Sequence, residues 1–344
     1  LADTNDIGFT AVRIAEGKNI PAGIYFRVLL CGITGHKQFA TDCGILLHPE
    51  QLVAVAAAMV RVFAEHGDRT DRKKARLKYL VDRWGMERFL QETEKKLAFP
   101  VLYFPKTDCE ARGAIDRAGH LGVHPQKQAG LSYVGVCTPV GWLTTEKALA
   151  LSDVADRFGN RELRLTVWQN LLLPNIATQS VSEVCSLLSE AGVKHSAGRV
   201  MSGAVACTGS RGCRFAATDT KGHALEVATL LDNAFVIDQP LNLHVTGCAH
   251  SCAQHYIGDI GLMGVKIGGE DGYQVNLGGG SDNDQAIARE LFPALPYNET
   301  KRRLHQLLAT YLESRFGGET FLQFSQRHTL EALQVMCERK VAIV

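Results

Sequence analysis

Two cysteine-containing stretches, ACTGSRGC at residues 206–213 and TGCAHSC at residues 246–252, carry the strongest structural signal in this chain. Their cysteines follow a C-x5-C pattern and a C-x3-C pattern. Structural zinc sites usually place paired thiolates two to four residues apart, so the first pair is loosely spaced for zinc. Iron–sulfur clusters accept wider spacing. The pattern therefore favours an iron–sulfur cluster over a chance grouping of small buried cysteines. The candidate ligands are Cys207, Cys213, Cys248 and Cys252.

The elements expected around these stretches place both cysteine pairs at strand ends. Residues 200–207 (VMSGAVAC) and 241–247 (LNLHVTG) read as strands, with a helix over residues 214–231 between them. Strand ends suit a preorganised site. Arg211 and Arg214 adjoin the first pair in sequence and supply the positive charge that an anionic cluster favours.

Composition is that of an ordinary globular protein with reduced thiols. The chain has 10 Cys in 344 residues, too few for a disulfide scaffold, and its first residues lack a basic region followed by an apolar run. A net charge of +1 with 21% charged residues argues against bulk nucleic-acid binding, and no apolar stretch approaches the roughly 20 residues that cross a bilayer. We therefore expect a cytoplasmic protein of two or three compact units, without nucleic-acid or membrane partners.

An internal repeat organises the sequence. Residues 5–9 (NDIGF) precede the strand-like IYFRVLLCG, and residues 258–262 (GDIGL) precede the strand-like YQVNLGGG. A long helical stretch over residues 49–91 follows the first copy, and helical segments over about residues 298–335 follow the second. Because so little sequence precedes the first DIG, we expect the chain to begin inside its first copy, with part of that copy upstream of Leu1.

The segment between the copies is predicted to form a small ferredoxin-like sandwich. LSYVGVCTPVGWL at residues 131–143 alternates like a strand pair, residues 144–159 form an amphipathic helix that ends at Gly159, and residues 162–176 form a second strand pair. A second helix should then complete a β-β-α-β-β-α order.

That second helix is predicted to open with a capping box, Ser180-x-x-Glu183, and to stop at Gly192. The whole pattern indicates an α+β fold. The predicted domains are residues 1–98 as part of the first repeat, 99–119 as a linker, 120–198 as the ferredoxin-like half-domain, and 199–344 as the cluster-binding domain.

These motifs together resemble a known family. The paired cysteine motif with DIG soon after it, preceded by HPQKQAGLSYVGV at residues 124–136 and LRLTVWQNLLLPNI at residues 163–176, is similar to the sirohaem- and [4Fe-4S]-containing nitrite and sulfite reductases. The closest likeness is to the ferredoxin-dependent assimilatory nitrite reductases. The resemblance covers nearly the whole chain. It implies a duplicated reductase architecture, six-electron reduction of nitrite to ammonia, electrons from a donor such as ferredoxin, and a monomeric enzyme.

The resemblance also assigns roles to individual residues. It implies that the four cysteines hold a [4Fe-4S] cluster and that Cys252 is also the axial ligand of the sirohaem iron. Sirohaem carries many carboxylates, so its pocket needs cationic and amide donors. The implied contacts are Arg164, Thr166, Gln169 and Asn170, with Gln126, Lys127 and Gln128 from the HPQKQ stretch. The arginines and lysines that hold the substrate anion are expected upstream of Leu1, so no residue here is assigned that role.

Several further residues have two interpretations. Asn276 and residues 278–280 (GGG) either approach the macrocycle closely or form a tight turn. Six basic residues between Arg69 and Lys78 are expected to lie on a solvated helix, or to form a docking patch for an acidic donor or reach towards sirohaem carboxylates. The remaining predictions are surface or capping roles for three histidines and core packing for the other cysteines: His244, His250 and His255; Cys31, Cys43, Cys109, Cys137, Cys185 and Cys337.

Other functions remain open at this point. Sulfite is an alternative substrate, because the anion-binding residues are expected outside this sequence. A precorrin-3B synthase-like enzyme of the cobalamin pathway shares the cysteine pattern, but the long match at residues 164–176 (RLTVWQNLLLPNI) favours the reductases. A truncated, inactive iron–sulfur or zinc module is the third alternative.

Overall fold

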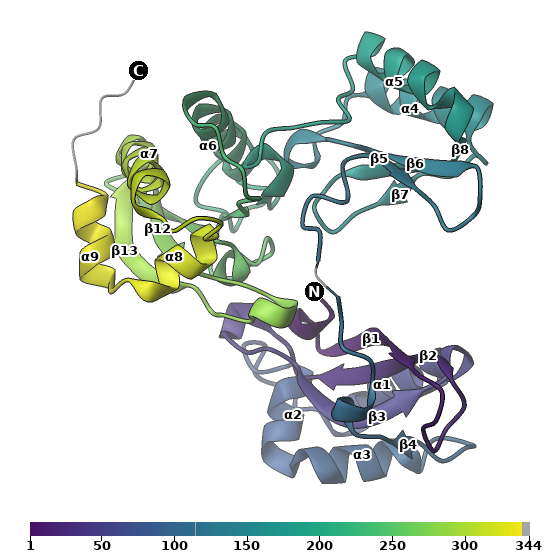
Figure 1. Ribbon diagram of the computed structural model, residues 1–344. Coiled ribbons are helices and arrows are strands. Elements are labelled where there is room, and N and C mark those ends of the chain that lie inside the picture. Colours follow the sequence, from purple (N-terminus) through teal and green to yellow (C-terminus); the bar gives the residue numbers. More distant parts are fainter. Residues whose placement is uncertain (114, 339–344) are drawn as a thin grey trace. The chain divides into compact units, whose positions relative to one another are not determined.

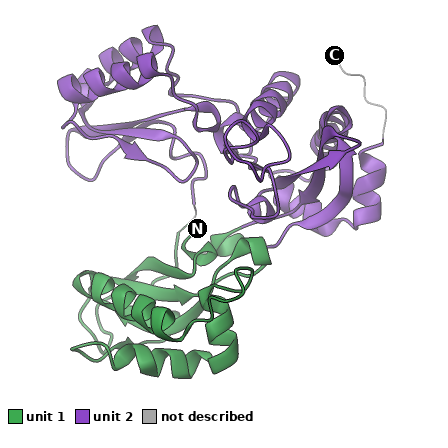
Figure 2. Cartoon of the chain, turned by 180° about the vertical axis from the view of Figure 1, so that it is seen from behind, with its two compact units in different colours: residues 1–114, 281–285 green, residues 115–280, 286–344 purple. Residues whose placement is uncertain are grey.

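The computed structural model describes residues 1–113 and 115–338. The chain forms two compact units (Figure 2), which are described separately. Unit 1 contains residues 1–113 with the short segment 281–285, and unit 2 contains the remaining described residues. One residue of the predicted linker and the end of the predicted cluster-binding domain lie outside the described residues: Ala114 and residues 339–344.

Unit 1 is built on a four-stranded antiparallel sheet in the order β1–β2–β3–β4 (Figure 1). Apolar side chains of the sheet, such as Val28 of β2 and Leu47 of β3, pack against helix side chains such as Met59. The elements are β1 (Ile7–Ile14), β2 (Gly23–Leu30), β3 (Thr41–Leu47), β4 (Leu102–Tyr103), α1 (Leu52–His66), α2 (Leu77–Trp84) and α3 (Met86–Glu94). The span 99–119, predicted as a linker, thus contributes β4 to this sheet.

The prediction of one long helical stretch over residues 49–91 is wrong. Helix α1 ends at Gly67, where a Cβ atom would lie 2.6 Å from the carbonyl oxygen of Phe63. The basic run then passes through turns and bends, and helix resumes only at Leu77. Most of its basic residues therefore lie on an irregular, exposed connection instead of on a helix face.

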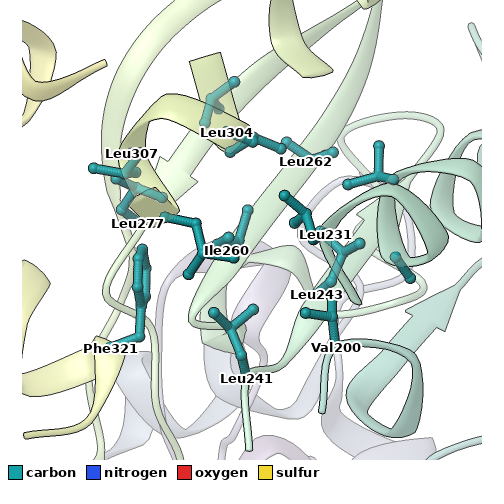
Figure 3. Close-up of a cluster of buried hydrophobic side chains, with 14 of the residues drawn as sticks. Val200, Leu231, Leu241, Leu243, Ile260, Leu262, Leu277, Leu304, Leu307 and Phe321 are labelled. Atoms are coloured by element: carbon teal, nitrogen blue, oxygen red, sulfur yellow. The ribbon is translucent and has the colours of Figure 1, made fainter. Parts of the chain in front are cut away.

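The largest core of unit 2 lies around a five-stranded sheet in the order β13–β12–β11–β10–β9. Strands β9, β10 and β11 are parallel, whereas β11, β12 and β13 are antiparallel. Figure 3 shows sheet residues such as Ile260 and Leu277 meeting Leu231, Leu304 and Phe321 of the helices. The elements are β9 (Ala204–Ala206), β10 (Leu243–Thr246), β11 (Ile260–Ile267), β12 (Glu270–Leu277), β13 (Arg289–Pro296), α6 (Thr220–Ala234), α7 (Tyr297–Ser314), α8 (Phe321–Arg327) and α9 (Leu330–Met336).

The two strands predicted to deliver cysteines are present, but the helix between them is shorter than predicted. Helix α6 begins at Thr220 instead of residue 214, because the side chain of Asp219 accepts a hydrogen bond from the backbone N–H of Gly222 and caps the helix there. Residues 214–219 form part of the cysteine loop instead.

Unit 2 also contains the predicted ferredoxin-like half-domain. Its antiparallel sheet has the order β5–β6–β8–β7, and side chains such as Val134, Leu151 and Val184 form a core between the sheet and its two helices. The elements are β5 (Gly122–Pro125), β6 (Leu131–Val136), β7 (Arg164–Leu165), β8 (Leu171–Ala177), α4 (Thr145–Phe158) and α5 (Val181–Glu190). The β-β-α-β-β-α order and the end of α4 before Gly159 are confirmed.

Two local predictions in the half-domain are wrong. Residues 131–143 contain one strand, β6, followed by a 3-10 turn, η5 (Pro139–Gly141), so the partner strand is the earlier β5. The capping box at Ser180 does not form, although helix α5 begins where predicted. A 3-10 turn ends at Ser180 and gives that residue a helical backbone, which differs from the extended conformation typical of an N-cap.

The internal repeat is confirmed pair by pair in the two hairpins. In the first copy Ile7 pairs with Leu30 and Gly8 with Leu29; in the second Ile260 pairs with Leu277 and Gly261 with Asn276.

The chain also leaves both hairpins in the same way. Cys31 and Gly278 have left-handed backbones with φ of 73° and 78°. Their N–H groups donate to the carbonyl oxygens of Asp6 (2.8 Å) and Asp259 (3.0 Å), the aspartates of the two DIG motifs. The same backbone construction therefore occurs twice.

Candidate metal centre

The two cysteine pairs meet at one edge of the five-stranded sheet. Cys207 follows β9 directly and Cys248 follows β10, and the carboxyl ends of these parallel strands lie side by side. Two backbone hydrogen bonds tie the loops together: Cys207 N–H donates to Val245 (3.1 Å), and Ala217 N–H donates to Gly247 (2.7 Å). The sheet therefore fixes the first cysteine of each pair.

One backbone amide and one hydroxyl group lie next to the sulfur of Cys207. The backbone N–H of Gly247 donates to Cys207 Sγ at 3.2 Å. Thr220 Oγ1 lies 3.6 Å from the same sulfur and donates to the carbonyl oxygen of Cys207 at 2.7 Å. An amide aimed at sulfur stabilises a thiolate and shifts the potential of a bound cluster. At the second pair, His250 Nδ1 lies 3.5 Å from Cys248 Sγ.

The four thiols lie within electrostatic reach of one another. Burial raises the pKa of Cys252, and negative charge on Cys207, Cys248 and Cys213 raises it further. All four are free thiols; three are half-buried and Cys252 is exposed. Four thiolates converging in this way would repel one another, and iron bound between them would remove that repulsion.

A single ion and a cluster require different arrangements of the four thiols. Within residues 1–113 and 115–338, no three or more His, Cys, Asp or Glu side chains are grouped closely enough to hold one metal ion. A zinc site needs all its ligand atoms about 2.0 to 2.3 Å from one centre. A [4Fe-4S] cluster spreads its thiolates over different irons, which requires a wider arrangement.

The two nearby arginines belong to the cysteine loops. Arg211 pairs with Asp219 (2.6 Å), the residue that caps α6, and its guanidinium lies 5.0 Å from the ring centre of Trp142. Arg214 lies over the ring of Phe215 at 4.8 Å. Both side chains are exposed, so they contribute positive charge at the surface of the site.

Three of the predicted sirohaem contacts build the loop beside β9. The side-chain amide of Gln169 pairs with Ala206 in both directions, donating to its carbonyl oxygen at 2.8 Å and accepting from its N–H at 3.1 Å. Asn170 is buried, and its Oδ1 accepts from the N–H of Thr138 (2.9 Å). Thr166 Oγ1 accepts from the N–H of Asn170 (3.1 Å). These side chains hold the half-domain against the residue before Cys207.

The other predicted contacts lie on the half-domain surface. Arg164 is exposed and pairs with Glu162 (2.5 Å). Gln126 donates to Asn175 Oδ1 (3.0 Å) and to Gln128 (3.1 Å), and Lys127 is exposed. Arg164 and Lys127 are therefore exposed cations on this surface.

The residues near the second copy of DIG differ from part of the prediction. His244 and His255 are buried, so a surface position is wrong for both, whereas His250 is exposed. Burial lowers the pKa of His244 to about 4, which keeps it neutral at physiological pH. Asn276 is buried on β12, and Gly278 makes the left-handed turn after it.

Sequence reasoning missed two residues beside Cys207. Thr220 and Lys221 occupy the first turn of α6, and negative charge on Cys207 affects the pKa of Lys221. The sequence signal for them was Asp219, since aspartate is a common N-cap residue. An N-cap at this position predicts that the helix begins at Thr220, close to the cysteine loop.

Comparisons with known proteins agree with this geometry. Residues 1–101 and 197–341 match the family described as nitrite and sulphite reductase 4Fe-4S domain, and residues 124–191 match the nitrite/sulfite reductase ferredoxin-like half domain. The chain therefore belongs to the nitrite and sulphite reductase 4Fe-4S domain family. This confirms the predicted resemblance.

The relatives include ferredoxin–nitrite reductases. The chain is 34% identical over 302 residues to the chloroplastic enzyme of Zea mays, covering 85% of this chain and 52% of that protein. It is 35% identical over 277 residues to the Synechococcus elongatus enzyme, covering 78% and 52%. The chain thus spans about half the length of these relatives.

Solved structures support the fold. The structure of the Mycobacterium tuberculosis NirA protein matches with a TM-score of 0.86 and 26% identity, over 97% of this chain and 62% of that one. This agreement confirms the duplicated α+β architecture. In the part of the chain that the structure describes, no helix is both long and apolar enough to span a bilayer.

Proposed function

We propose that this chain is the cofactor-binding part of a sirohaem-dependent reductase that converts nitrite to ammonia with electrons from a donor such as ferredoxin. The observation that carries the proposal is the convergence of four free thiols at the carboxyl ends of β9 and β10. The relatives that are named ferredoxin–nitrite reductases support nitrite as the substrate and ferredoxin as the donor.

In this proposal the cluster is held by Cys207, Cys213, Cys248 and Cys252, with Cys252 shared by the sirohaem iron. Its greater exposure favours that shared role, because a bridging sulfur must face both groups. When bound, the two cofactors would supply one-electron transfer to the iron that binds nitrite. The Gly247 amide would favour the Cys207 thiolate.

The half-domain would then contribute the cations. Arg164 and Lys127 are exposed and would neutralise sirohaem carboxylates, whereas Gln169 and Asn170 would support the pocket from behind, since their side chains are already bonded within the protein. Exposed basic residues in the connection before α2 support an acidic electron donor: Arg69, Arg72, Lys73 and Lys74.

Replacing one ligand tests the cluster. In protein purified without oxygen, Cys213→Ser should lose most of its iron and acid-labile sulfide, because an alkoxide is a poor substitute for a soft thiolate. Cys185→Ser, on helix α5, is the matched control and should keep both. Full iron content in Cys213→Ser would remove this residue from the site.

An absorption spectrum and a turnover assay test the rest. Sirohaem should give a Soret band and a red band, while a bare cluster gives only broad absorption. The gene product that contains these residues should form ammonia from nitrite when a reduced ferredoxin is supplied. Colourless zinc-containing protein, or faster turnover of sulfite than of nitrite, would contradict the proposal.

A further inference from the structure

Lys221 lies between the cysteine site and the ferredoxin-like half-domain. It occupies the first turn of α6, directly after Thr220, whose hydroxyl contacts both the sulfur and the carbonyl oxygen of Cys207. Its side chain is half-buried, and its ammonium donates a hydrogen bond to the carbonyl oxygen of Val140 in turn η5. A flexible lysine is thereby fixed in place next to the threonine that contacts the first cysteine.

The turn that receives Lys221 has an unusual backbone. Val140 is almost fully buried and has φ of 49° and ψ of 28°, a conformation that β-branched residues rarely adopt. The next residue is glycine, and a Cβ atom there would lie 3.5 Å from Lys221 Nζ. A strained residue thus presents its carbonyl oxygen to the amine, and the amine packs against the glycine that follows.

The ammonium has one charged neighbour of consequence. Burial lowers the pKa of Lys221, and negative charge on Cys207 opposes this effect. Among the described residues, Lys221 forms no ion pair with a carboxylate, and its ammonium bonds to the neutral carbonyl group of Val140 instead. The amino end of helix α6 adds partial positive charge on the same side.

We propose that Lys221 raises the reduction potential of the cluster bound through Cys207. Reduction adds one electron, supplied by the donor, to a centre that already carries net negative charge. A partly buried cation nearby stabilises the reduced state more than the oxidised state, because charges interact more strongly where water is excluded. This inference rests on the proposed function, since it requires the cluster.

Removing the charge tests the proposal. The chain is loaded with iron and sulfide without oxygen, and its potential is measured by redox titration followed by electron paramagnetic resonance. Lys221→Gln should lower the equilibrium constant for cluster reduction about tenfold, which is a downward shift of about 59 mV for one electron. Lys221→Arg should keep the parental potential, and Lys147→Gln, the same charge loss on helix α4, should leave it unchanged.

The outcomes separate the two proposals. If the parent takes up no cluster, the proposed function fails before Lys221 is examined. A loaded Lys221→Gln protein with the parental potential would overturn the present inference, and so would a shift of equal size in Lys221→Arg. If Lys221→Gln fails to load, Lys221→Met is measured instead. Failure of both to bind iron would overturn the inference, since it would give the lysine a purely structural role.

Discussion

The two copies of the repeat share a β-hairpin but differ in the strands that pair with it. In the described residues of the first copy, β1 pairs with β2 alone. In the second copy, β11 pairs with β12 on one side and with the parallel strand β10 on the other. All four cysteines proposed as cluster ligands follow β9 or β10. Among the described residues, only the hairpin of the second copy therefore has a parallel neighbour, and the cysteines proposed as cluster ligands follow that neighbour or the next strand.

The aspartates of the two DIG motifs show the same contrast. Asp259 is buried, pairs with Arg117 at 2.6 Å and accepts the N–H of Asn242 at 2.7 Å. Asp6 pairs with Arg76 at the surface. The aspartate of the second copy is therefore paired in the protein interior, whereas the aspartate of the first copy forms its ion pair at the solvent-exposed surface.

Substituting the hairpin glycines should give the largest effect. A Cβ atom at Gly261 would lie 1.9 Å from the carbonyl oxygen of the fully buried His255, so Gly261→Ala should cost more than about 4 kcal/mol. In Gly8→Ala the new Cβ atom would lie 2.1 Å from the carbonyl oxygen of Ala2. Ala2 is partly exposed on a short turn that can shift, so this substitution should cost less. Hydrogen exchange measured on peptides from each hairpin compares the loss of local stability in the two variants. Equal loss of protection in both would contradict the greater rigidity of the second copy.

Removing the aspartates should give an intermediate effect. Asp259→Ala leaves Arg117 without its partner and should destabilise unit 2 by about 3 kcal/mol. Asp6→Ala removes an exposed pair and should cost less than about 1 kcal/mol. Urea unfolding followed by hydrogen exchange compares them. If the two variants unfold at the same urea concentration, the contrast between buried and exposed pairs is wrong.

The smallest effect is expected where the chain leaves the hairpins. Gly278→Ala forces a side chain into a left-handed backbone, at about 1 to 2 kcal/mol, and its Cβ would lie 2.8 Å from Ser325 Oγ. Cys31→Gly relieves the same strain in the first copy but loses a buried sulfur, so stability should change by less than about 1 kcal/mol. Thermal unfolding measures both. A larger loss in Cys31→Gly than in Gly278→Ala would show that the two positions are not equivalent.

Much of the framework was predictable because its signals are local. The DIG repeat, the strands that deliver Cys207 and Cys248, and the helix that ends before Gly159 all follow from short patterns of apolar residues and glycine. The errors arose where one local signal competed with another. Residues 69–76 favour helix in composition, but Gly67 ends the preceding helix.

The candidate site was predictable only in part. Cysteine spacing predicts which residues are the ligands, but no sequence pattern shows that the amide of Gln169 pairs with Ala206, which lies 37 residues further along the chain. The position of Lys221 depends in the same way on the contact of α6 with turn η5. Long-range contacts of this kind arise from tertiary packing, which single-sequence patterns do not encode.

The pairing of Gln169 with Ala206 also has a consequence for the order of events during synthesis. Domains generally fold as units from the amino end as the chain emerges from the ribosome. The half-domain precedes Ala206 in the chain, so Gln169 can be in place when strand β9, which ends directly before Cys207, emerges. Because β9 also pairs with β10 and the N–H of Cys207 donates to Val245, Cys207 reaches its final position only after β10 has joined the sheet, so the half-domain contact comes first and the strand pairing second.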